Sequence, residues 1–358
     1  MTFKRVTLKD ISKAVGLSVP VVSRIMNDRE TYCSERKIRA VKETAARLGY
    51  QRNVGYRIMT GRGTNIVAVL FSQRRHLYAP HINQLYMYLN AELRRRRFAS
   101  YYTVLETTMT TEEQVAAIRE LDDLGCRSYI FIGYPTGYSE LQAFLESRSR
   151  TSISMNNGDA SRRLLTDEAG VGALCVEDWL ARGLGNFRYV TSEEHLERFV
   201  LPRLAPEHRE ILRRNRLTLP VGDVTRFSDD APDEALFRGG YRLARRTLAE
   251  DPGLQAMFLG NDYSALGAAR AAIEAGRHDI EFCGMNRTIA AKYAFYPLRT
   301  GVFDMRECAK QLVEHMDGRE ELEIVIPGEL VRCDVMDFSD ADPDLAAYDF
   351  HKEKKYSL

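Results

Sequence analysis

From residue 65 onward, short apolar runs alternate with longer segments of helical period, and this alternation limits the folds that the chain can adopt. We expect buried strands at 65–71, 100–105, 128–132 and 151–154, with helices at 80–97, 111–124 and 138–148. A second series predicts strands at 187–191, 217–221, 256–259 and 280–283, with helices at 168–182, 194–214, 233–250 and 263–275. Such alternation predicts parallel sheets covered on both faces. Two series predict two lobes, with a ligand cleft between them at the carboxyl ends of the strands.

The charges are balanced over the whole chain but not along it. There are 51 Lys or Arg and 50 Asp or Glu, yet residues 1–62 hold 14 basic and 5 acidic residues, a net charge of +9. The remainder, with a total of +1 for the chain, therefore carries −8. A basic head on an acidic body is typical of a domain that meets a polyanion, joined to one that does not. A solvated basic surface would give the same charge, so the pattern inside the head decides.

The head predicts three short helices. Thr7 followed by Asp10 indicates a helix start, and Gly16 a helix end. Ser18 can cap a second helix, which accepts Pro20 in its first turn. In that helix Val22 and Ile25 face inward, and the outward residues are Val19, Pro20, Val21, Ser23 and Arg24. A third helix starts at Ser34, with an apolar stripe of Ile38, Val41, Ala45 and Leu48. Together they predict a helix-turn-helix module.

The sequence of this head resembles the DNA-binding head of LacI-type transcription regulators. The matching runs are Val6-Thr7-Leu8-Lys9-Asp10-Ile11, Ala14-Val15-Gly16-Leu17-Ser18, Val22-Ser23-Arg24-Ile25-Met26-Asn27 and Ala46-Arg47-Leu48-Gly49-Tyr50. The resemblance implies DNA contacts from Thr7, Ser18, Val19, Pro20, Val21, Ser23, Arg24, Asn27, Tyr50, Asn53 and Met59. Val19 and Pro20 fall at the base-reading positions, where apolar side chains can touch a thymine methyl group but make no bidentate contact.

The family places a hinge helix after the head, and this helix folds only on the operator. The equivalent residues are 53–61, with Met59 at the position that enters the minor groove. Arg52 replaces the usual proline, and Gly55 with Tyr56 stands where helix formers are expected. Because glycine costs a helix interior about 1 kcal/mol relative to alanine, we expect this hinge to order with difficulty and only on DNA. A plain linker at 53–63 is the alternative.

Most of residues 65–335 resembles the effector domain of the same family, which is similar to periplasmic sugar-binding proteins, and the middle part, 156–235, matches only in outline. The strongest part is Phe258-Leu259-Gly260-Asn261-Asp262-Tyr263-Ser264-Ala265-Leu266-Gly267-Ala268. The resemblance implies an effector site with Tyr78, His81, Asn156 or its neighbour Asn157, Arg198, Asn261 and Asn286. We expect Asp262 to be the N-cap of the next helix instead. Asn286 replaces the aspartate of sugar binders, and with Arg198 and Arg287 nearby it favours an anionic sugar derivative. A neutral saccharide, with Arg287 facing solvent, is the alternative.

The sequence gives only weak signals of other functional classes, such as enzymes, metal-binding proteins and membrane proteins. Gly61-Arg62-Gly63 lacks the third glycine of a dinucleotide fingerprint, and the sequence holds no P-loop, G-x-S-x-G or H-E-x-x-H. The seven histidines show no ligand spacing and the six cysteines form no C-x-x-C pair, so we expect no metal, no cofactor and reduced thiols. We take the run Arg94–Arg97 as the solvated end of a helix, the alternative being a second nucleic-acid patch. No apolar stretch reaches the roughly 20 residues of a membrane span, which predicts a cytoplasmic protein.

The sequence thus predicts a DNA-binding transcription regulator, a repressor and not an enzyme, that binds a pseudo-palindromic operator as a homodimer and responds to a sugar-like effector. We expect a head at 1–52, a hinge at 53–63, an effector domain at 64–338 and a tail at 339–358. One alternative is a constitutive regulator with a degenerate cleft. Another is a sugar-binding protein or an enzyme with a vestigial head.

Overall fold

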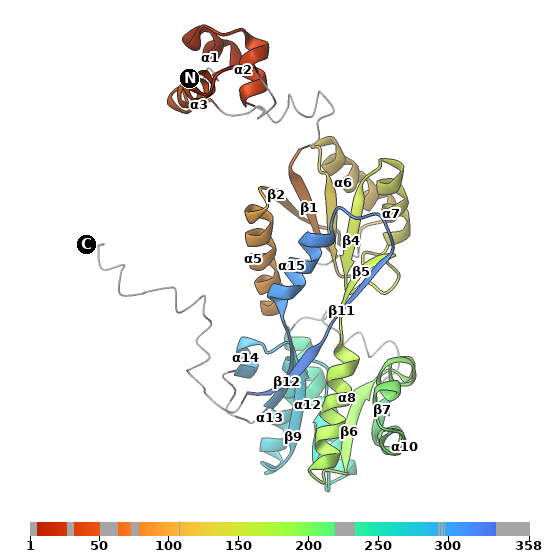
Figure 1. Cartoon of the computed structure of the whole chain (residues 1–358). Helices are drawn as coiled ribbons and strands as arrows, with labels where there is room; N and C mark the ends of the chain where they lie inside the picture. The colour runs from red at the N-terminus through yellow and green to blue at the C-terminus, as the bar shows by residue number, and fades with distance from the viewer. Residues whose placement is uncertain are drawn as a thin grey trace, which may run out of the picture. The chain divides into compact units, whose positions relative to one another are not determined.

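The computed structural model describes residues 6–26, 32–50, 64–72, 79–106, 108–218, 233–292, 294, 296 and 298–333. The chain divides into two compact units, Met1–Thr64 and Asn65–Leu358 (Figure 1). The expected hinge at 53–63 and tail at 339–358 lie outside the described residues. The four domain bounds therefore stay predictions.

The first unit consists of α1 (Leu8–Val15), α2 (Val19–Met26) and α3 (Glu35–Arg47). Its core is formed by apolar side chains that are at most 3% exposed, namely Ile11, Val22, Ile25, Val41 and Ala45. The backbone N–H of Thr7 donates to Asp10 Oδ2 at 2.8 Å, which begins α1 as the sequence predicts. Leu48 does not belong to the apolar stripe of α3, since it lies at the C-cap and is 37% exposed.

The first lobe of the second unit has a parallel sheet with the strand order β11-β5-β4-β3-β1-β2. The strands are β1 (Ile66–Phe71), β2 (Ala99–Val104), β3 (Ser128–Ile132), β4 (Thr151–Met155), β5 (Arg162–Thr166) and β11 (Leu322–Ile326). The helices are α5 (Pro80–Arg95), α6 (Thr111–Asp123), α7 (Tyr138–Ser147) and α15 (Met305–His315). Alternate residues of β1 face opposite layers, with Val67 and Val69 packed toward α5 and α15, and Ala68 and Leu70 toward α6 and α7.

The second lobe has the strand order β12-β10-β9-β8-β6-β7. Its strands are β6 (Phe187–Thr191), β7 (Arg216–Thr218), β8 (Ala256–Phe258), β9 (Glu281–Met285), β10 (Leu298–Phe303) and β12 (Gly328–Arg332). Its longer helices are α8 (Glu168–Ala181), α10 (Pro206–Asn215), α12 (Asp233–Glu250) and α13 (Asp262–Glu274), with the short α14 (Ile289–Lys292). One apolar core packs α12 and α13 on the sheet, and the other packs α8 and α10.

The two lobes are not two consecutive halves of the chain. The chain passes between the lobes at 166–168, 303–305 and 326–328, so α15 and β11 return to the first lobe after the second is nearly complete (Figure 1). Strand β12 pairs antiparallel with β10, which is the exception to the predicted parallel sheets. The peptide links between the lobes therefore lie side by side at their junction.

The single helix predicted at 194–214 is wrong in its continuity. The segment forms α9 (Glu193–His195), a π-helical turn (Leu196–Val200), a 3-10 turn (Leu201–Arg203) and then α10. Pro202 and Pro206 explain the break, because each lacks an N–H and is accepted only in the first turn of a new helix.

Candidate nucleic-acid interface and ligand pocket

Helix α2 presents a polar and partly apolar face to the outside of the first unit. Ser18, Pro20 and Arg24 are exposed, and Val19 is 38% exposed. Val22 and Ile25 on the opposite face are buried in the core, as predicted. Val21 departs from the expectation, because it packs partly against the core of this unit. Ser23 is half-buried.

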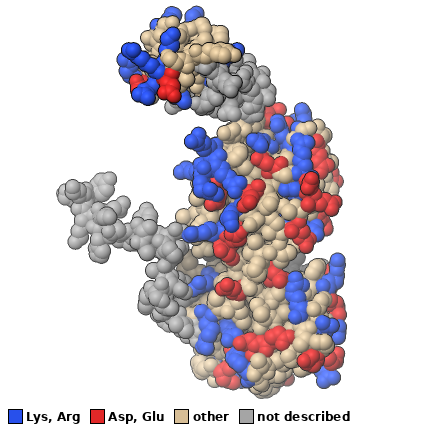
Figure 2. All heavy atoms as spheres, viewed as in Figure 1, with Lys and Arg blue, Asp and Glu red and all other residues tan. Residues whose placement is uncertain are grey.

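The other predicted contact residues of the head differ in their surroundings. Thr7 is exposed, and its hydroxyl donates to Asp10 Oδ2 at 2.7 Å. Tyr50 packs against the core of the head and is half-buried. Asn27, Asn53 and Met59 lie outside the described residues. The described surface of this unit also carries exposed Lys and Arg on α1 and α3, namely Lys9, Lys13, Arg36, Lys37, Arg39, Lys42 and Arg47. Figure 2 shows Lys and Arg side chains of this unit as blue spheres.

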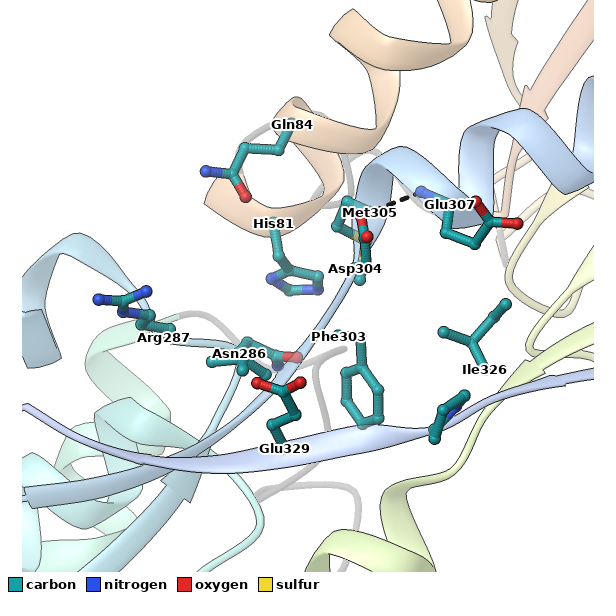
Figure 3. Close-up of a pocket in the computed structure, with 12 residues that line it drawn as sticks. His81, Gln84, Asn286, Arg287, Phe303, Asp304, Met305, Glu307, Ile326 and Glu329 are labelled. Atoms are coloured by element: carbon teal, nitrogen blue, oxygen red, sulfur yellow. Dashed lines mark hydrogen bonds between the residues drawn. The ribbon is translucent and has the colours of Figure 1, made fainter. Parts of the chain in front are cut away.

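A pocket of about 560 Å³ opens where the chain passes between the lobes (Figure 3). His81 and Gln84 reach it from the first turns of α5, and Asn286 and Arg287 from the end of β9. The segments between the lobes supply the rest of the lining: Val302, Phe303, Asp304, Met305, Glu307, Ile326, Pro327 and Glu329. The structure thus brings together His81 and Asn286, two of the residues predicted to bind an effector.

The backbone at the end of β9 turns sharply to present two of these side chains. Asn286 has φ 86° and Arg287 has φ 42°, both in the left-handed region. The turn is held by two hydrogen bonds, since Asn286 N–H donates to the Gly301 carbonyl at 2.8 Å and Arg287 N–H to Thr300 Oγ1 at 3.0 Å. Asparagine accepts this conformation more readily than most residues, which suits it to the position.

Asn261, and not Asp262 as predicted, caps the helix that follows. Asn261 is the N-cap of α13, where its Oδ1 accepts from the Tyr263 N–H at 2.9 Å. Asp262 is not the cap. Its buried carboxylate accepts from the Thr288 N–H at 2.6 Å and from the Thr300 hydroxyl at 2.7 Å, which joins α13 to the turn behind Asn286.

The remaining predicted effector residues do not line this pocket. Asn156 is exposed, and its Oδ1 accepts from both the N–H and the hydroxyl of Thr166. Its neighbour Asn157 is buried and accepts from the Asp159 N–H at 3.1 Å. Arg198 is 65% exposed and pairs with Glu194 at 2.6 Å. Tyr78 lies outside the described residues.

No family model matches the sequence. The sucrose operon repressor of Streptococcus mutans is 33% identical over 86 residues, which cover 24% of this chain and 26% of that protein. The chain thus matches about a quarter of the length of this curated relative.

Solved structures match over much more of the chain. The Lac repressor dimer bound to operator and the anti-inducer ONPF is 20% identical, covers 92% of this chain and 98% of its own, and has a TM-score of 0.69. The transcriptional regulator CelR in complex with cellobiose is 18% identical, covers 92% and 100%, and has a TM-score of 0.56. A LacI family regulator from Enterococcus faecium with bound ribose is 19% identical, covers 74% and 96%, and has a TM-score of 0.57.

The chain has the fold of a LacI-type regulator. A match over 92% of 358 residues leaves about 29 unmatched, fewer than the first unit contains, so the LacI-type fold extends into the three-helix head. Among the described residues, no helix has the length and apolar character needed to cross a membrane. The same residues hold no group of three or more His, Cys, Asp or Glu side chains placed to bind a metal ion.

The sequence did not predict several of the residues that line the pocket of this LacI-type fold. Asp304 and Glu307 follow β10, and Glu329 is the second residue of β12, after the last passage between the lobes. The available signal was the position of these carboxylates next to segments that leave one sheet for the other.

Proposed function

We propose that this chain is a sequence-specific DNA-binding transcription repressor, and not an enzyme, whose operator affinity is modulated by a small sugar-like effector. The observation that carries the proposal is the exposed face of α2, with Val19, Pro20 and Arg24, in a basic three-helix head attached to a two-lobed unit of LacI-type fold. Such a helix enters the major groove, where its first turn meets base edges and a nearby arginine meets phosphate. We expect this activity in the cytoplasm.

The effector is proposed to bind in the pocket between the lobes. Its described lining carries three carboxylates, Asp304, Glu307 and Glu329, against one arginine, Arg287. Carboxylates only accept hydrogen bonds, so they suit the hydroxyl groups of a neutral sugar and oppose a phosphate or an acid. Arg198 is engaged with Glu194 and does not line the pocket, which removes part of the reason for an anionic ligand. A neutral saccharide is therefore favoured.

The coupling is proposed to act through the segments that join the lobes. A ligand that bridges His81 and Asn286 contacts both lobes and favours one of their relative arrangements. Operator affinity then changes by the difference in binding free energy between the two arrangements.

A homodimer on a pseudo-palindromic site would use both heads. Met87 on α5 and Ile289 on α14, 68% and 65% exposed, are apolar side chains that such an interface could cover.

The test is a selection of bound duplexes from a random DNA pool with the full chain, followed by titration of the selected sequence with and without candidate sugars. We expect a pseudo-palindrome and a sugar-dependent change in its affinity. A pseudo-palindrome whose affinity no sugar changes would favour the constitutive regulator. Failure to select any sequence above the non-specific level would favour a sugar-binding protein or an enzyme and overturn the proposal.

A further inference from the structure

Four consecutive arginines, Arg94–Arg97, form an exposed basic cluster at the end of α5, in the strongly blue area of the first lobe in Figure 2. Arg94, Arg95 and Arg97 are exposed and Arg96 is half-buried. We call these residues the arginine cluster. A helix carboxyl end attracts cations, and this accounts for Arg94 and Arg95 in the last turn. It does not account for Arg97, which follows the helix.

Arg97 occupies a backbone position that favours glycine. Its φ is 62°, its N–H donates to the Arg94 carbonyl at 2.9 Å, and the next N–H, of Phe98, donates to the Leu93 carbonyl at 2.8 Å. The end of α6 has the same two bonds, with Gly125 in the equivalent place at φ 80°. A side chain with a Cβ is disfavoured in this conformation. Arginine therefore occupies a position at which glycine is expected to make the folded chain more stable.

The charges of the arginine cluster are only partly neutralised. Arg95 pairs with Glu92 at 2.7 Å, and Arg96 approaches Glu314 at 4.0 Å. The guanidinium groups of Arg94 and Arg97 make no ion pair with another residue that the structure describes. Arg127 lies close by, with its guanidinium over the Phe98 ring, and pairs with Asp317. Among the described residues, two positive charges of the arginine cluster are thus without an anionic partner.

The arginine cluster lies beside the residue at which the second unit begins. Asn65 Nδ2 donates to the Arg97 carbonyl at 3.4 Å, and the Asn65 carbonyl accepts from the Ala99 N–H at 2.7 Å. Residue 65 is the point at which the polypeptide arrives from the basic head. Any DNA that the head binds is consequently tethered, through residues 51–63, to this end of the lobe.

We propose that the arginine cluster binds the phosphate backbone of duplex DNA next to the sequence that the head reads. The inference rests on the proposed function of the head, which supplies the DNA. Arginine is well suited to phosphate because its planar group donates two parallel hydrogen bonds. Such contacts carry no sequence information but add to affinity and to its salt dependence.

The test uses the full chain with Arg94→Gln and Arg97→Gly together, and two labelled duplexes. One is the selected operator alone, and the other is the operator with flanking random sequence on both sides. Each phosphate contact contributes about 0.9 to the slope of log affinity against log salt. We expect the double variant to lower that slope by about 1.8 for each protomer, hence by about 3.6 for a homodimer, on the long duplex and to leave the short one unchanged. Random duplex without an operator serves as a third probe.

Ser149→Gly is the matched control. Ser149 occupies the same position at the end of α7, with φ 54°, an N–H that donates to the Glu146 carbonyl and a following Arg150 N–H that donates to the Leu145 carbonyl. Both glycine changes relieve the same backbone strain, so we expect each to maintain or raise the melting temperature. Only the change at Arg97 is expected to weaken DNA binding.

The outcomes separate the inference from the proposed function. A wild-type slope in the double variant on the long and random duplexes overturns the inference while leaving operator reading intact. An equal loss in Ser149→Gly would trace the effect to backbone structure and also overturn it. A changed oligomeric state with an unchanged slope would assign the arginine cluster to a protein interface. Absence of any preferred sequence in the wild type contradicts the proposed function instead, and the random duplex still tests the phosphate contacts.

Discussion

The carboxylate of Asp262 ties together two parts of the second lobe that are distant in the sequence. It is 1% exposed and accepts hydrogen bonds from Thr288 and Thr300. We expect Asp262→Ala to leave two buried donors unpaired and to lower the free energy of unfolding by about 2–4 kcal/mol. Urea denaturation measures this effect, with Asp123→Ala on the exposed face of α6 as the control. If the free energy of unfolding fell as little as in the control variant, water would be replacing the carboxylate.

His195 makes stability depend on pH in a defined direction. Burial lowers the pKa of His195 below its ordinary value of 6.5, and the positive charge of Arg203 lowers it further. Below about pH 6.5 the unfolded chain therefore takes up this proton before the folded chain does, so stability falls as the pH falls and is retained above that value. We expect His195→Gln to lose less stability between about pH 6.5 and 5 than the wild type. The same dependence of the free energy of unfolding on pH in the variant and the wild type would contradict this prediction. The control is His278→Gln, because His278 is exposed.

The residue-scale predictions from sequence succeeded where neighbours in sequence decide the structure. The start of α1 at Thr7 and Asp10 is such a case, and so is the inward face of α2. Asp262 shows the opposite case. An Asn-Asp pair before a helix leaves open which residue caps it, and the answer depends on Thr288 and Thr300, which lie 26 and 38 residues away. The same holds for Asn156, whose partner is set by the pairing of β4 with β5.

At the scale of elements, burial explains which strands could be predicted. The first four strands are nearly continuous apolar runs or lie between clear helices, and each predicted end falls within one residue of the structure. The sequence analysis missed β5, β10, β11 and β12, in which polar and apolar residues are mixed and no continuous apolar run marks a strand. Without them the return of the chain to the first lobe, and hence the pocket lining, could not be predicted.

Helices α12 and α13 approach each other through glycine. A Cβ on Gly267 would lie 1.9 Å from the Phe237 carbonyl oxygen, and one on Gly240 would lie 2.0 Å from the Ser264 carbonyl oxygen. We expect Gly267→Ala to force the helices apart and to lower the free energy of unfolding by about 1–3 kcal/mol. Gly185→Ala, whose Cβ would have no atom within 4 Å, is the control. Equal stability of the two variants in urea denaturation would show that the helices can shift without loss.

Helix α2 gives a prediction on DNA. Arg24 is exposed near the end of this helix, where we expect it to contact a phosphate. Arg24→Ala should weaken binding to all sequences and lower the slope of log affinity against log salt by about 0.9 for each head that is bound, hence by about 1.8 for the homodimer. Fluorescence anisotropy over a range of salt concentrations measures it, with Arg238→Ala on α12 as the control. An unchanged slope with an altered base preference would make Arg24 a base-reading residue.

For the whole molecule, the placement of the pocket at the lobe junction matters more than any one lining residue. Phe303, Asp304 and Pro327 belong to the segments that carry the chain between the lobes. A rearrangement of the lobes must therefore change the shape of the pocket, and a ligand held there must resist or favour that rearrangement. The sequence predicted a cleft between two lobes, but not that the connecting segments themselves would line it.

The chemistry of the effector can be tested through Glu329, whose side chain makes no hydrogen bond or ion pair with another described residue. We expect neutral sugars, and not their phosphates or acids, to raise the melting temperature of the wild type. A ligand at 100 times its dissociation constant stabilises by about 2.7 kcal/mol, and a tenfold weaker affinity at the same concentration leaves about 1.4 kcal/mol. Glu329→Gln should show such a reduced shift, because an amide accepts fewer hydrogen bonds from hydroxyls than a carboxylate does. Operator affinity without sugar should remain that of the wild type, and Glu112→Gln on the exposed face of α6 should behave as the wild type throughout. A shift in melting temperature that only anionic sugars produce, or one that Glu329→Gln enlarges, would instead favour an anionic effector.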